Sequence, residues 1–296
     1  WYTIERPQYM KTAFLKAPET QEDQPKHTKI LQEFYDNGMV FMPVENFEAS
    51  TKKFLNNIQE IFKKPIQRFS SSTIEDKSVE YFDEKGRNWQ YNNAEGILSV
   101  SLADTRHHLY REMSNLYGDY KGDSPYTLSS AITEFPYLQD VLRNPTTLKL
   151  ADYANFNDTE PVQIKIERKT YTTKAEKYNE HYIHLDTVDK STFKSYVYLN
   201  DVSEKNGAIT FSKKSHHWKL YPRLLNYIRV RGKQFPLEQI IKLKIPPLQP
   251  VCGKTGTVFG FTGNGVHSAA NVEQEQERWT LQCYYYSKTL WATNKK

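Results

Sequence analysis

The hydrophobic pattern of the chain changes its period near residue 161, and this change limits the folds that the chain can adopt. The segment PVQIKIERKTYT (161–172) alternates apolar and polar residues, as a half-buried strand does. Further strands are expected at 193–202, 207–212, 255–263 and 278–287. The turn dipeptide Asn206-Gly207 joins two of them. The second half of the chain is therefore expected to be antiparallel β structure, and the alternate residues Trp279, Leu281, Cys283 and Tyr285 of its last strand are expected to lie in the core.

The residues before this change have mostly helical spacing. Helices are predicted around Ile30–Tyr35, at 47–64 and at 125–155. Gly38 is a plausible stop for the first helix, and MVFMPV (39–44) then predicts a short strand. Residues 70–98 are polar and turn-rich, and they are expected to form a long surface excursion.

Composition narrows the class of protein and of partner. Aromatic residues make up 14% of the 296 residues, so a folded globular chain is expected. The net charge of +5 is spread without a long basic run, which argues against a nucleic-acid surface and suits solubility or attraction of an acidic small molecule. No stretch approaches the apolar length of a membrane helix. We therefore expect a small-molecule partner, no nucleic acid and no membrane, and a monomer or homodimer.

The chain has two cysteines, Cys252 and Cys283. Two cysteines can form one disulfide but no disulfide framework, and their spacing matches no zinc motif. A reducing compartment is favoured, so a cytoplasmic location is expected. No signal peptide is visible, and removal of an upstream segment stays open because the chain starts at Trp1.

A histidine and an aspartate stand two residues apart in HYIHLDTV (181–188). In a strand, residues i and i+2 point to the same face, so the side chains of His184 and Asp186 are expected to reach one common point. That point can be a metal ion, a catalytic proton or only water. The pair by itself leaves these alternatives open, and a surface pair without function is the simplest of them.

A second histidine and an arginine extend this pair. His267 lies on a short apolar stretch after a glycine-rich turn, and Arg278 begins a strong strand eleven residues later. Two histidines and one carboxylate are the ligand set of the facial triad, which binds Fe(II) and leaves positions open for a co-substrate and O₂. An arginine can grip a carboxylate in bidentate fashion. These residue types suit iron and a dicarboxylate together.

The order of these motifs resembles the phytanoyl-CoA dioxygenase-like (PhyH) group of Fe(II)/2-oxoglutarate-dependent oxygenases. His184-x-Asp186 is followed by LNDVSEKNGAITFSKKSHHW (199–218), then by His267 and Arg278. Within it, NGAITFSKKSH resembles the Asn-Gly to Ser-His segment of the family, and EFYDNGMVFMPV (33–44) resembles its N-terminal helix–strand entry. The resemblance covers roughly residues 28–288.

The resemblance implies a fold and a set of roles. The fold would be mainly β with flanking helices, a double-stranded β-helix (a jelly-roll, cupin-like barrel). His184, Asp186 and His267 would bind Fe(II), and Arg278 would hold the distal carboxylate of 2-oxoglutarate, with O₂ as the other co-substrate. One catalytic domain is expected over 1–296. Its parts would be an extended arm (1–26), a mostly helical part (27–160) and a jelly-roll core (161–288) with an insert at 216–250.

The chain departs from the family pattern at two positions. Many relatives have Ser or Thr two residues after the distal histidine, where this chain has Ala269. Thr280, on the same strand face as Arg278, is the expected substitute. The usual glycine before Ser-His is Lys214 here, so that turn is expected to differ. Lys165 is a further candidate for the co-substrate, and the alternative is that Lys165 and Glu167 lie on a solvated face.

The expected activity is oxidation of an unactivated C–H bond in a small, acidic or amino-acid-like metabolite of secondary metabolism. Hydroxylation, desaturation and oxidative cyclisation of the kainoid-synthase kind are all compatible with it. Halogenation is disfavoured because the carboxylate ligand Asp186 is present. Arg223, Arg229 and Arg231 of the insert are candidates for substrate binding, or belong to a solvated loop. The alternatives are an acyl thioester or sugar substrate, and a non-catalytic jelly-roll binding protein.

Overall fold

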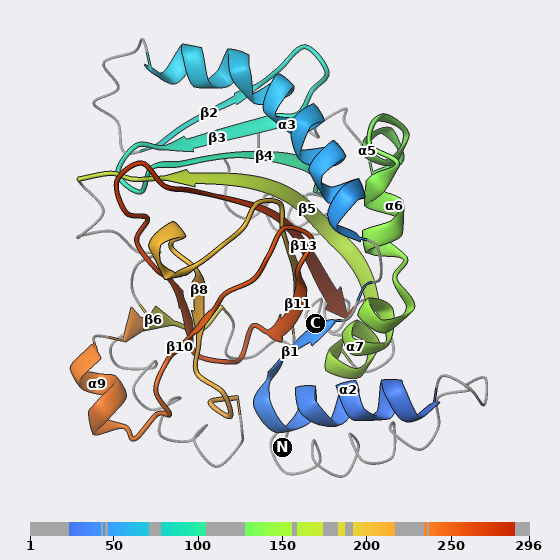
Figure 1. Cartoon of the computed structure of the whole chain (residues 1–296), viewed down its shortest axis with the longest axis vertical. Coiled ribbons are helices and arrows are strands. Elements are labelled where there is room, and N and C mark those ends of the chain that lie inside the picture. Colours follow the sequence, from blue (N-terminus) through green and yellow to red (C-terminus); the bar gives the residue numbers. More distant parts are fainter. Residues whose placement is uncertain are drawn as a thin grey trace, which may run out of the picture.

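The computed structural model of the chain contains two antiparallel β-sheets, with most of the helices on one side (Figure 1). It describes residues 24–42, 44, 47–70, 78–104, 128–155, 159–173, 183–186, 192–216, 234–235 and 237–287. The larger sheet has eight strands in the order β1 (Met39–Met42), β11 (Val258–Thr262), β7 (Thr192–Tyr198), β13 (Glu277–Ser287), β5 (Thr159–Thr170), β4 (Ile97–Asp104), β3 (Asn88–Asn92) and β2 (Ser78–Phe82). The smaller sheet has five, in the order β10 (Gln249–Val251), β8 (Ile209–Phe211), β12 (His267–Ala269), β6 (Ile183–His184) and β9 (Gln234–Phe235). This is the double-stranded β-helix with flanking helices that the sequence predicted.

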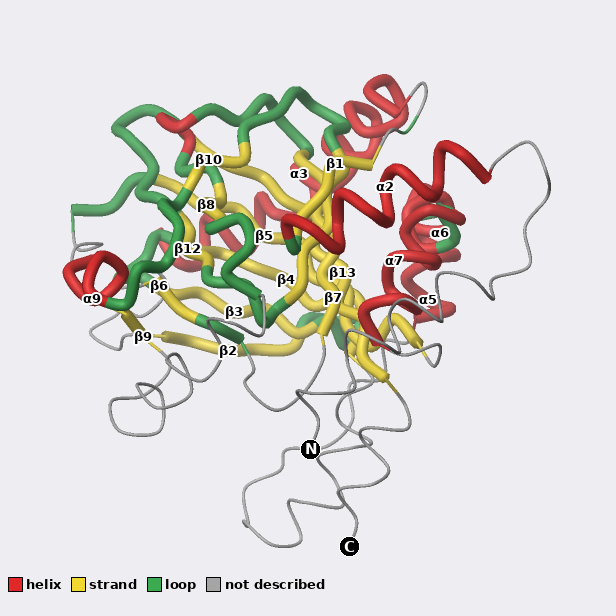
Figure 2. The backbone as a smooth tube through the Cα atoms, turned by 90° about the horizontal axis from the view of Figure 1, so that it is seen from below, coloured by secondary structure: helices red, strands yellow, loops and turns green. Residues whose placement is uncertain are grey.

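The helices surround the two sheets unequally. They are α2 (Gln24–Asn37), α3 (Phe47–Ser70), α5 (Leu128–Glu134), α6 (Tyr137–Leu142), α7 (Pro145–Asn155) and α9 (Leu237–Lys242), with a 3₁₀ turn η2 at Glu204–Asn206. Figure 2 shows α2, α5, α6 and α7 on one side of the strands and α9 on the other. The three predicted helical regions are confirmed, and α3 continues through Pro65 to Ser70.

The outer face of the larger sheet forms the main hydrophobic core. Its central stripe on β13 consists of Trp279, Leu281, Cys283 and Tyr285, all buried, as strand alternation predicted. The ring of Phe62 from α3 meets the ring of Trp279 edge-on, with centroids 4.8 Å apart. Burial of this apolar stripe against α3, α6 and α7 therefore fixes which face of the sheet points away from the helices.

The opposite, inner face of the larger sheet is polar although it is covered. Tyr196 and Tyr198 of β7 pack there against Ile209 and Phe211 of the smaller sheet. The residues of β13 on this face are Arg278, Thr280, Gln282 and Tyr284, and their partners on β5 and β7 include Lys169, Glu167, Lys165 and Lys194. Buried polar groups are costly unless they are paired, so a covered face of this kind indicates a site rather than a structural core.

The expectation of a surface excursion over residues 70–98 is wrong where the structure describes that segment. Residues 78–104 form the antiparallel meander β2–β3–β4, which extends the larger sheet beyond β5. It also adds strands to the part at 27–160 that was expected to be mostly helical. The strands escaped prediction because polar residues such as Asn88 and Gln90 alternate within them, and two turns interrupt the segment at Gly86 and Gly96.

The insert at 216–250 is also more regular than the sequence indicated, at least in its described part. It contains β9, which pairs with β6, and the short helix α9. Ile240 of α9 packs with Ile183 and Leu185 beneath the smaller sheet. The insert therefore contributes structure next to the segment that carries His184 and Asp186.

Helix α2 ends at Gly38, as predicted. Gly38 has a left-handed backbone (φ 75°), and its N–H donates to the carbonyl of Phe34 at 2.7 Å. The carbonyl of Asn37 accepts a hydrogen bond from the N–H of Lys214 at 3.0 Å. His216 Nε2 donates to the carbonyl of Tyr35 at 2.9 Å, so His216 has a structural role here. The Ser-His segment thus closes the C-terminal end of α2.

Replacing Gly38 with alanine is expected to lower the free energy of unfolding. The left-handed backbone alone costs an L-residue about 1–2 kcal/mol, and a Cβ at this position would collide with the imidazole of His216. Denaturant unfolding of Gly38→Ala measures the loss. Adding His216→Ala should restore the part due to the collision, and a Gly38→Ala variant as stable as the parent would contradict the prediction.

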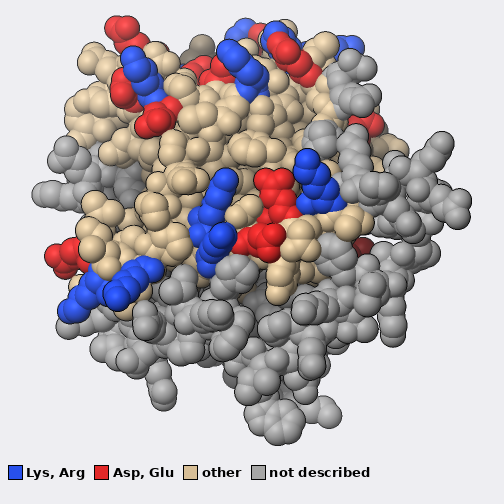
Figure 3. All heavy atoms as spheres, turned by 60° about the horizontal axis from the view of Figure 1, so that its bottom comes forward, with Lys and Arg blue, Asp and Glu red and all other residues tan. Residues whose placement is uncertain are grey.

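The surface carries charges of both signs. On the face shown in Figure 3, Lys and Arg side chains alternate with Asp and Glu and do not gather into one basic field. No helix in the described part of the chain combines the length and the apolar character needed to cross a bilayer.

Candidate metal centre

Strands β6 and β12 place two histidines opposite each other. They pair antiparallel, and His267 is the direct partner of His184 in the register. Their rings lie with centroids 4.4 Å apart, at 51° to each other. Directly opposed residues of antiparallel strands bring their Cβ atoms close together, so this register suffices to bring the two imidazoles into one site.

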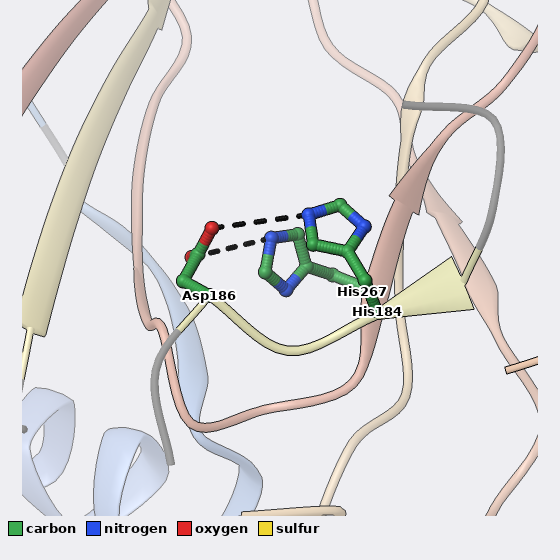
Figure 4. A group of neighbouring side chains, drawn as sticks. All are labelled: His184, Asp186 and His267. Carbon is green, nitrogen blue, oxygen red and sulfur yellow. Dashed lines mark ion pairs between the residues drawn. The ribbon is translucent and has the colours of Figure 1, made fainter. Parts of the chain in front are cut away.

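Asp186 reaches the same point by a different route from the one expected. Strand β6 ends at His184, so Asp186 is not in the strand, and the prediction that strand alternation aligns the pair is wrong. The chain bends after the buried Leu185, and the N–H of Asp186 donates to the carbonyl of Gly263 at 3.0 Å. This bend turns the carboxylate of Asp186 toward both imidazoles (Figure 4).

The three side chains have the geometry of a ligand set. His184 Nε2 lies 3.8 Å from Asp186 Oδ1, and His267 Nε2 lies 3.4 Å from Asp186 Oδ2. One ligand atom of each residue lies within 4.8 Å of the other two. Two imidazole nitrogens and one carboxylate oxygen are the donors of the iron facial triad, so the residues present fit Fe(II).

The imidazole of His267 is held in one orientation. Its Nδ1 donates to the carbonyl of Gly265 at 2.8 Å, which leaves Nε2 as the nitrogen with a lone pair on the side of Asp186. The segment before it is fixed as well, because Val266 N–H donates to Ser215 Oγ at 2.7 Å. Such hydrogen bonds fix the tautomer and the ring orientation of metal-binding histidines.

Asp186 is ionised in this environment. Burial would raise the pKa of Asp186, but the ammonium of Lys194 beside it is the largest opposing effect, and that pKa lies far below its usual range. Lys194 Nζ lies 2.8 Å from Asp186 Oδ2. Lys194 was not predicted as a site residue, although parity along 192–198 places it on the same face as Tyr196 and Tyr198.

Arg278 lies on the inner face, as predicted, and it already has partners. Its Nη2 lies 3.0 Å from Glu167 Oε1, and its Nη1 donates to the carbonyl of Gly207. The other oxygen of Glu167 lies 3.2 Å from Lys165 Nζ. Glu167 and Arg278 are buried and Lys165 is nearly so, and the alternative of a solvated face for Lys165 and Glu167 is therefore wrong.

The carboxylate of Glu167 carries its charge despite its burial. Desolvation would raise the pKa of Glu167, but the positive charges of Lys165, Arg278 and Lys169 lower it to about 2. Three cations thus surround one carboxylate, and the cluster keeps an excess of positive charge. An excess of this kind can accept a further carboxylate.

A chain of hydrogen bonds runs along β13 from Tyr284 to Thr280, on the face that also carries Arg278. Gln282 Nε2 donates to Thr280 Oγ1 at 3.0 Å, and Tyr284 OH donates to Gln282 Oε1 at 2.8 Å. Lys194 Nζ stands 4.8 Å from the ring centroid of Tyr284. Thr280 shares its face with Arg278, as predicted, whereas Gln282 and Tyr284 were missed because only the strand register shows what they face.

The two departures from the family pattern have different outcomes. Lys214 has φ 67°, so the turn keeps the left-handed backbone that glycine favours although the residue is a lysine. Ala269 ends β12 and packs against the apolar cluster between the sheets, where it offers no hydroxyl group. Thr280, on the face of Arg278, offers a hydroxyl group and is fully buried.

Several predicted residues lie outside the described part of the chain. They are the candidate substrate-binding residues Arg223, Arg229 and Arg231, together with most of the arm at 1–26. The metal-centre residues, Arg278, Thr280 and Lys165 are all described.

A profile of the family described as Phytanoyl-CoA dioxygenase (PhyH) matches residues 103–279, which is more than half of the chain. No curated protein matches the chain significantly.

Solved structures share the fold at low identity. The non-heme α-ketoglutarate-dependent epimerase SnoN from nogalamycin biosynthesis superposes with a TM-score of 0.53 at 14% identity, over 90% of this chain and 84% of SnoN. The carbocyclase SnoK from the same biosynthesis gives 0.51 at 14%, over 92% and 87%. EctD from S. alaskensis, with 2-oxoglutarate and 5-hydroxyectoine, gives 0.50 at 14%, over 94% and 81%. These likenesses confirm the double-stranded β-helix.

Proposed function

Because the chain belongs to the phytanoyl-CoA dioxygenase (PhyH) family of Fe(II)/2-oxoglutarate-dependent oxygenases, we propose that His184, Asp186 and His267 hold the Fe(II) of this enzyme. The observation that supports the proposal most directly is the convergence of one ligand atom from each residue within 4.8 Å. Bound Fe(II), with 2-oxoglutarate and O₂, supplies the oxidant that removes a hydrogen atom from a substrate C–H bond.

In this proposal the residues of the chain hold and orient the reactants. Gly265 and Gly263 fix His267 and Asp186 through their carbonyl groups, so the ligands are organised before the metal arrives. Arg278 receives the distal carboxylate of 2-oxoglutarate, with Thr280 and Lys165 beside it. The position of all three on the covered inner face, next to the excess of positive charge around Glu167, supports this assignment.

We propose a small acidic or amino-acid-like metabolite as the substrate. Positive charge on the inner face supports an anionic substrate, because four described cations stand there against the carboxylates Glu167 and Asp186. The four cations are Lys165, Lys169, Lys194 and Arg278. The fold carries epimerisation in SnoN and carbocycle formation in SnoK, so ring closure of the kainoid-synthase kind is as compatible with it as hydroxylation. An acyl thioester or a sugar is the alternative substrate class.

Succinate formation tests the proposal. With Fe(II), ascorbate and 2-oxoglutarate, succinate release should rise when an anionic amino acid or carboxylic acid from a metabolite panel is added, and it should rise less with neutral sugars or acyl thioesters. Stimulation by sugars or acyl thioesters alone would contradict the amino-acid or carboxylic-acid substrate class. Absence of succinate under every condition, in an enzyme that binds metal, would favour a non-catalytic binding protein.

The insert provides a prediction about substrate capture. If Arg223, Arg229 or Arg231 pairs with a carboxylate of the substrate, its replacement by alanine should raise the KM for the substrate about tenfold or more, since a hydrogen bond to a charged group contributes about 1.5–3 kcal/mol. The KM for 2-oxoglutarate should stay nearly constant. Steady-state kinetics of the three single variants measures both constants. Three variants with parental kinetics would remove these arginines from the substrate site.

A further inference from the structure

Lys194 occupies an unusual place beside the proposed metal ligands. It points from β7 into the space between the sheets, and only 9% of its side chain is exposed. Its ammonium lies 2.8 Å from Asp186 Oδ2. The rings of Tyr284 and Phe261 flank the ammonium, with centroids 4.8 and 5.8 Å from Nζ. The side chain is therefore confined near Asp186.

This ammonium changes the charge that the metal meets. With neutral imidazoles, Asp186 contributes one negative charge and Lys194 one positive charge, so the ligand set together with Lys194 is neutral. A divalent metal then adds two positive charges that nothing in this group offsets. The metal ion and the ammonium of Lys194 would both contact the carboxylate of Asp186. They would therefore lie within the ~4–6 Å over which two charges strongly affect each other in a partly buried site.

The dianion 2-oxoglutarate reduces this excess. Its distal carboxylate is assigned to Arg278, and its other carboxylate offsets one of the two positive charges that the metal adds. Lys194 therefore disfavours the complex with metal alone more than the complex with both metal and co-substrate. Favourable coupling of this kind is reciprocal, because each ligand raises the affinity of the other by the same factor.

We propose that Lys194 couples metal binding to 2-oxoglutarate binding by opposing a divalent metal until the co-substrate dianion is present. The inference rests on the proposed function, in that Asp186 is taken as a metal ligand. Lys194 is a positioning residue in this account and takes no part in bond breaking. The opposite possibility is that the ammonium only supports Asp186 in its orientation, and the two differ in the sign of the effect on metal affinity.

Titration with Mn(II) in the absence and presence of 2-oxoglutarate tests the coupling without turnover. In the parent enzyme, 2-oxoglutarate should tighten Mn(II) binding about tenfold or more. In Lys194→Met, Mn(II) alone should bind about tenfold or more tightly than in the parent, and the additional gain from 2-oxoglutarate should shrink by a similar factor. Lys194→Arg keeps the charge and should keep most of the coupling.

Matched controls separate the coupling from other losses. Lys254→Met removes a lysine that also lies 2.8 Å from an aspartate, in the exposed pair with Asp201 outside the site, and it should leave the affinity for Mn(II) alone unchanged. Asp186→Ala should lose Mn(II) binding. If it does not, the proposed metal site fails whatever Lys194 does. Where Asp186→Ala behaves as expected, weaker or unchanged Mn(II) binding in Lys194→Met overturns the coupling role.

Discussion

Replacing Asp186 with alanine is expected to abolish 2-oxoglutarate-dependent turnover and to weaken Fe(II) binding by more than about 100-fold, beyond what loss of an outer hydrogen-bond partner of a ligand typically costs. Asp186 is the anionic member of the proposed set, and its carboxylate lies within 3.4 Å of His267 Nε2 and 3.8 Å of His184 Nε2. Without it, two neutral imidazoles remain for a hard divalent cation. His184→Ala and His267→Ala should behave in the same way.

Metal titration and succinate release together check this result. Asp36→Ala is a suitable control, because Asp36 is an exposed aspartate on α2 whose carboxylate accepts a hydrogen bond from Gln32. The control should keep parental activity and metal affinity. Parental activity in any one of the three ligand variants would contradict the assignment of these residues as a facial triad.

The second large effect is expected at Arg278. Its replacement by alanine should raise the KM for 2-oxoglutarate about 10- to 100-fold, since a charge-assisted bidentate contact contributes about 1.5–3 kcal/mol. Arg278→Lys should recover only part of the loss, because an ammonium cannot donate two parallel hydrogen bonds to one carboxylate. Steady-state kinetics at varied 2-oxoglutarate gives the KM values.

The ion pair with Glu167 makes a further control necessary. Removing Arg278 takes away one of the positive charges that offset the buried carboxylate of Glu167. Breaking a buried ion pair destabilises a protein by about 3–5 kcal/mol. The double variant Arg278→Ala/Glu167→Gln removes that carboxylate charge as well. If the double variant regained parental affinity for 2-oxoglutarate, the loss would come from the stranded Glu167 and not from a missing contact. Arg168→Ala, at the partly exposed pair with Glu277, controls for the loss of an arginine.

The KM for the substrate, measured in the Arg278 variants, distinguishes the binding site of 2-oxoglutarate from that of the substrate. Arg278→Ala should change it little if the substrate carboxylate binds elsewhere, for example at the arginines of the insert. A rise in both constants would place the substrate carboxylate near Arg278 as well.

Elements whose pattern is local could be predicted from the amino-acid sequence. Alternation along 278–287 predicted both a strand and its buried side, because a pleated strand with one apolar face can be oriented in only one way against a core. Helical spacing around Ile30–Tyr35 and the glycine at position 38 predicted α2 and its end. The residue types at 184, 186, 267 and 278 indicated iron and a dicarboxylate, because those donor sets are chemically specific.

How these residues meet depends on contacts between parts of the chain that are far apart in sequence. The pairing of His184 with His267 is a register between strands 83 residues apart, and no local pattern encodes it. The bend that turns Asp186 toward them depends on a hydrogen bond to Gly263 from another part of the chain. The strands of the meander β2–β4 were not predicted for a related reason. Strands with many polar residues lack a clear apolar pattern, and only their pairing in the sheet identifies them as strands.

The partners of the charged residues on the inner face were decided in the same way. Strand parity places Lys194 and Glu167 on a face, but it does not say which charges from other strands stand opposite. The contact of Glu167 with Arg278 joins strands 111 residues apart, and the contact of Lys194 with Asp186 joins β7 to the bend that follows β6. Charge interactions depend on distance and burial, and both quantities exist only after the sheets have packed. The chemistry available to the site could therefore be predicted from residue types, whereas its electrostatic balance arises from the fold.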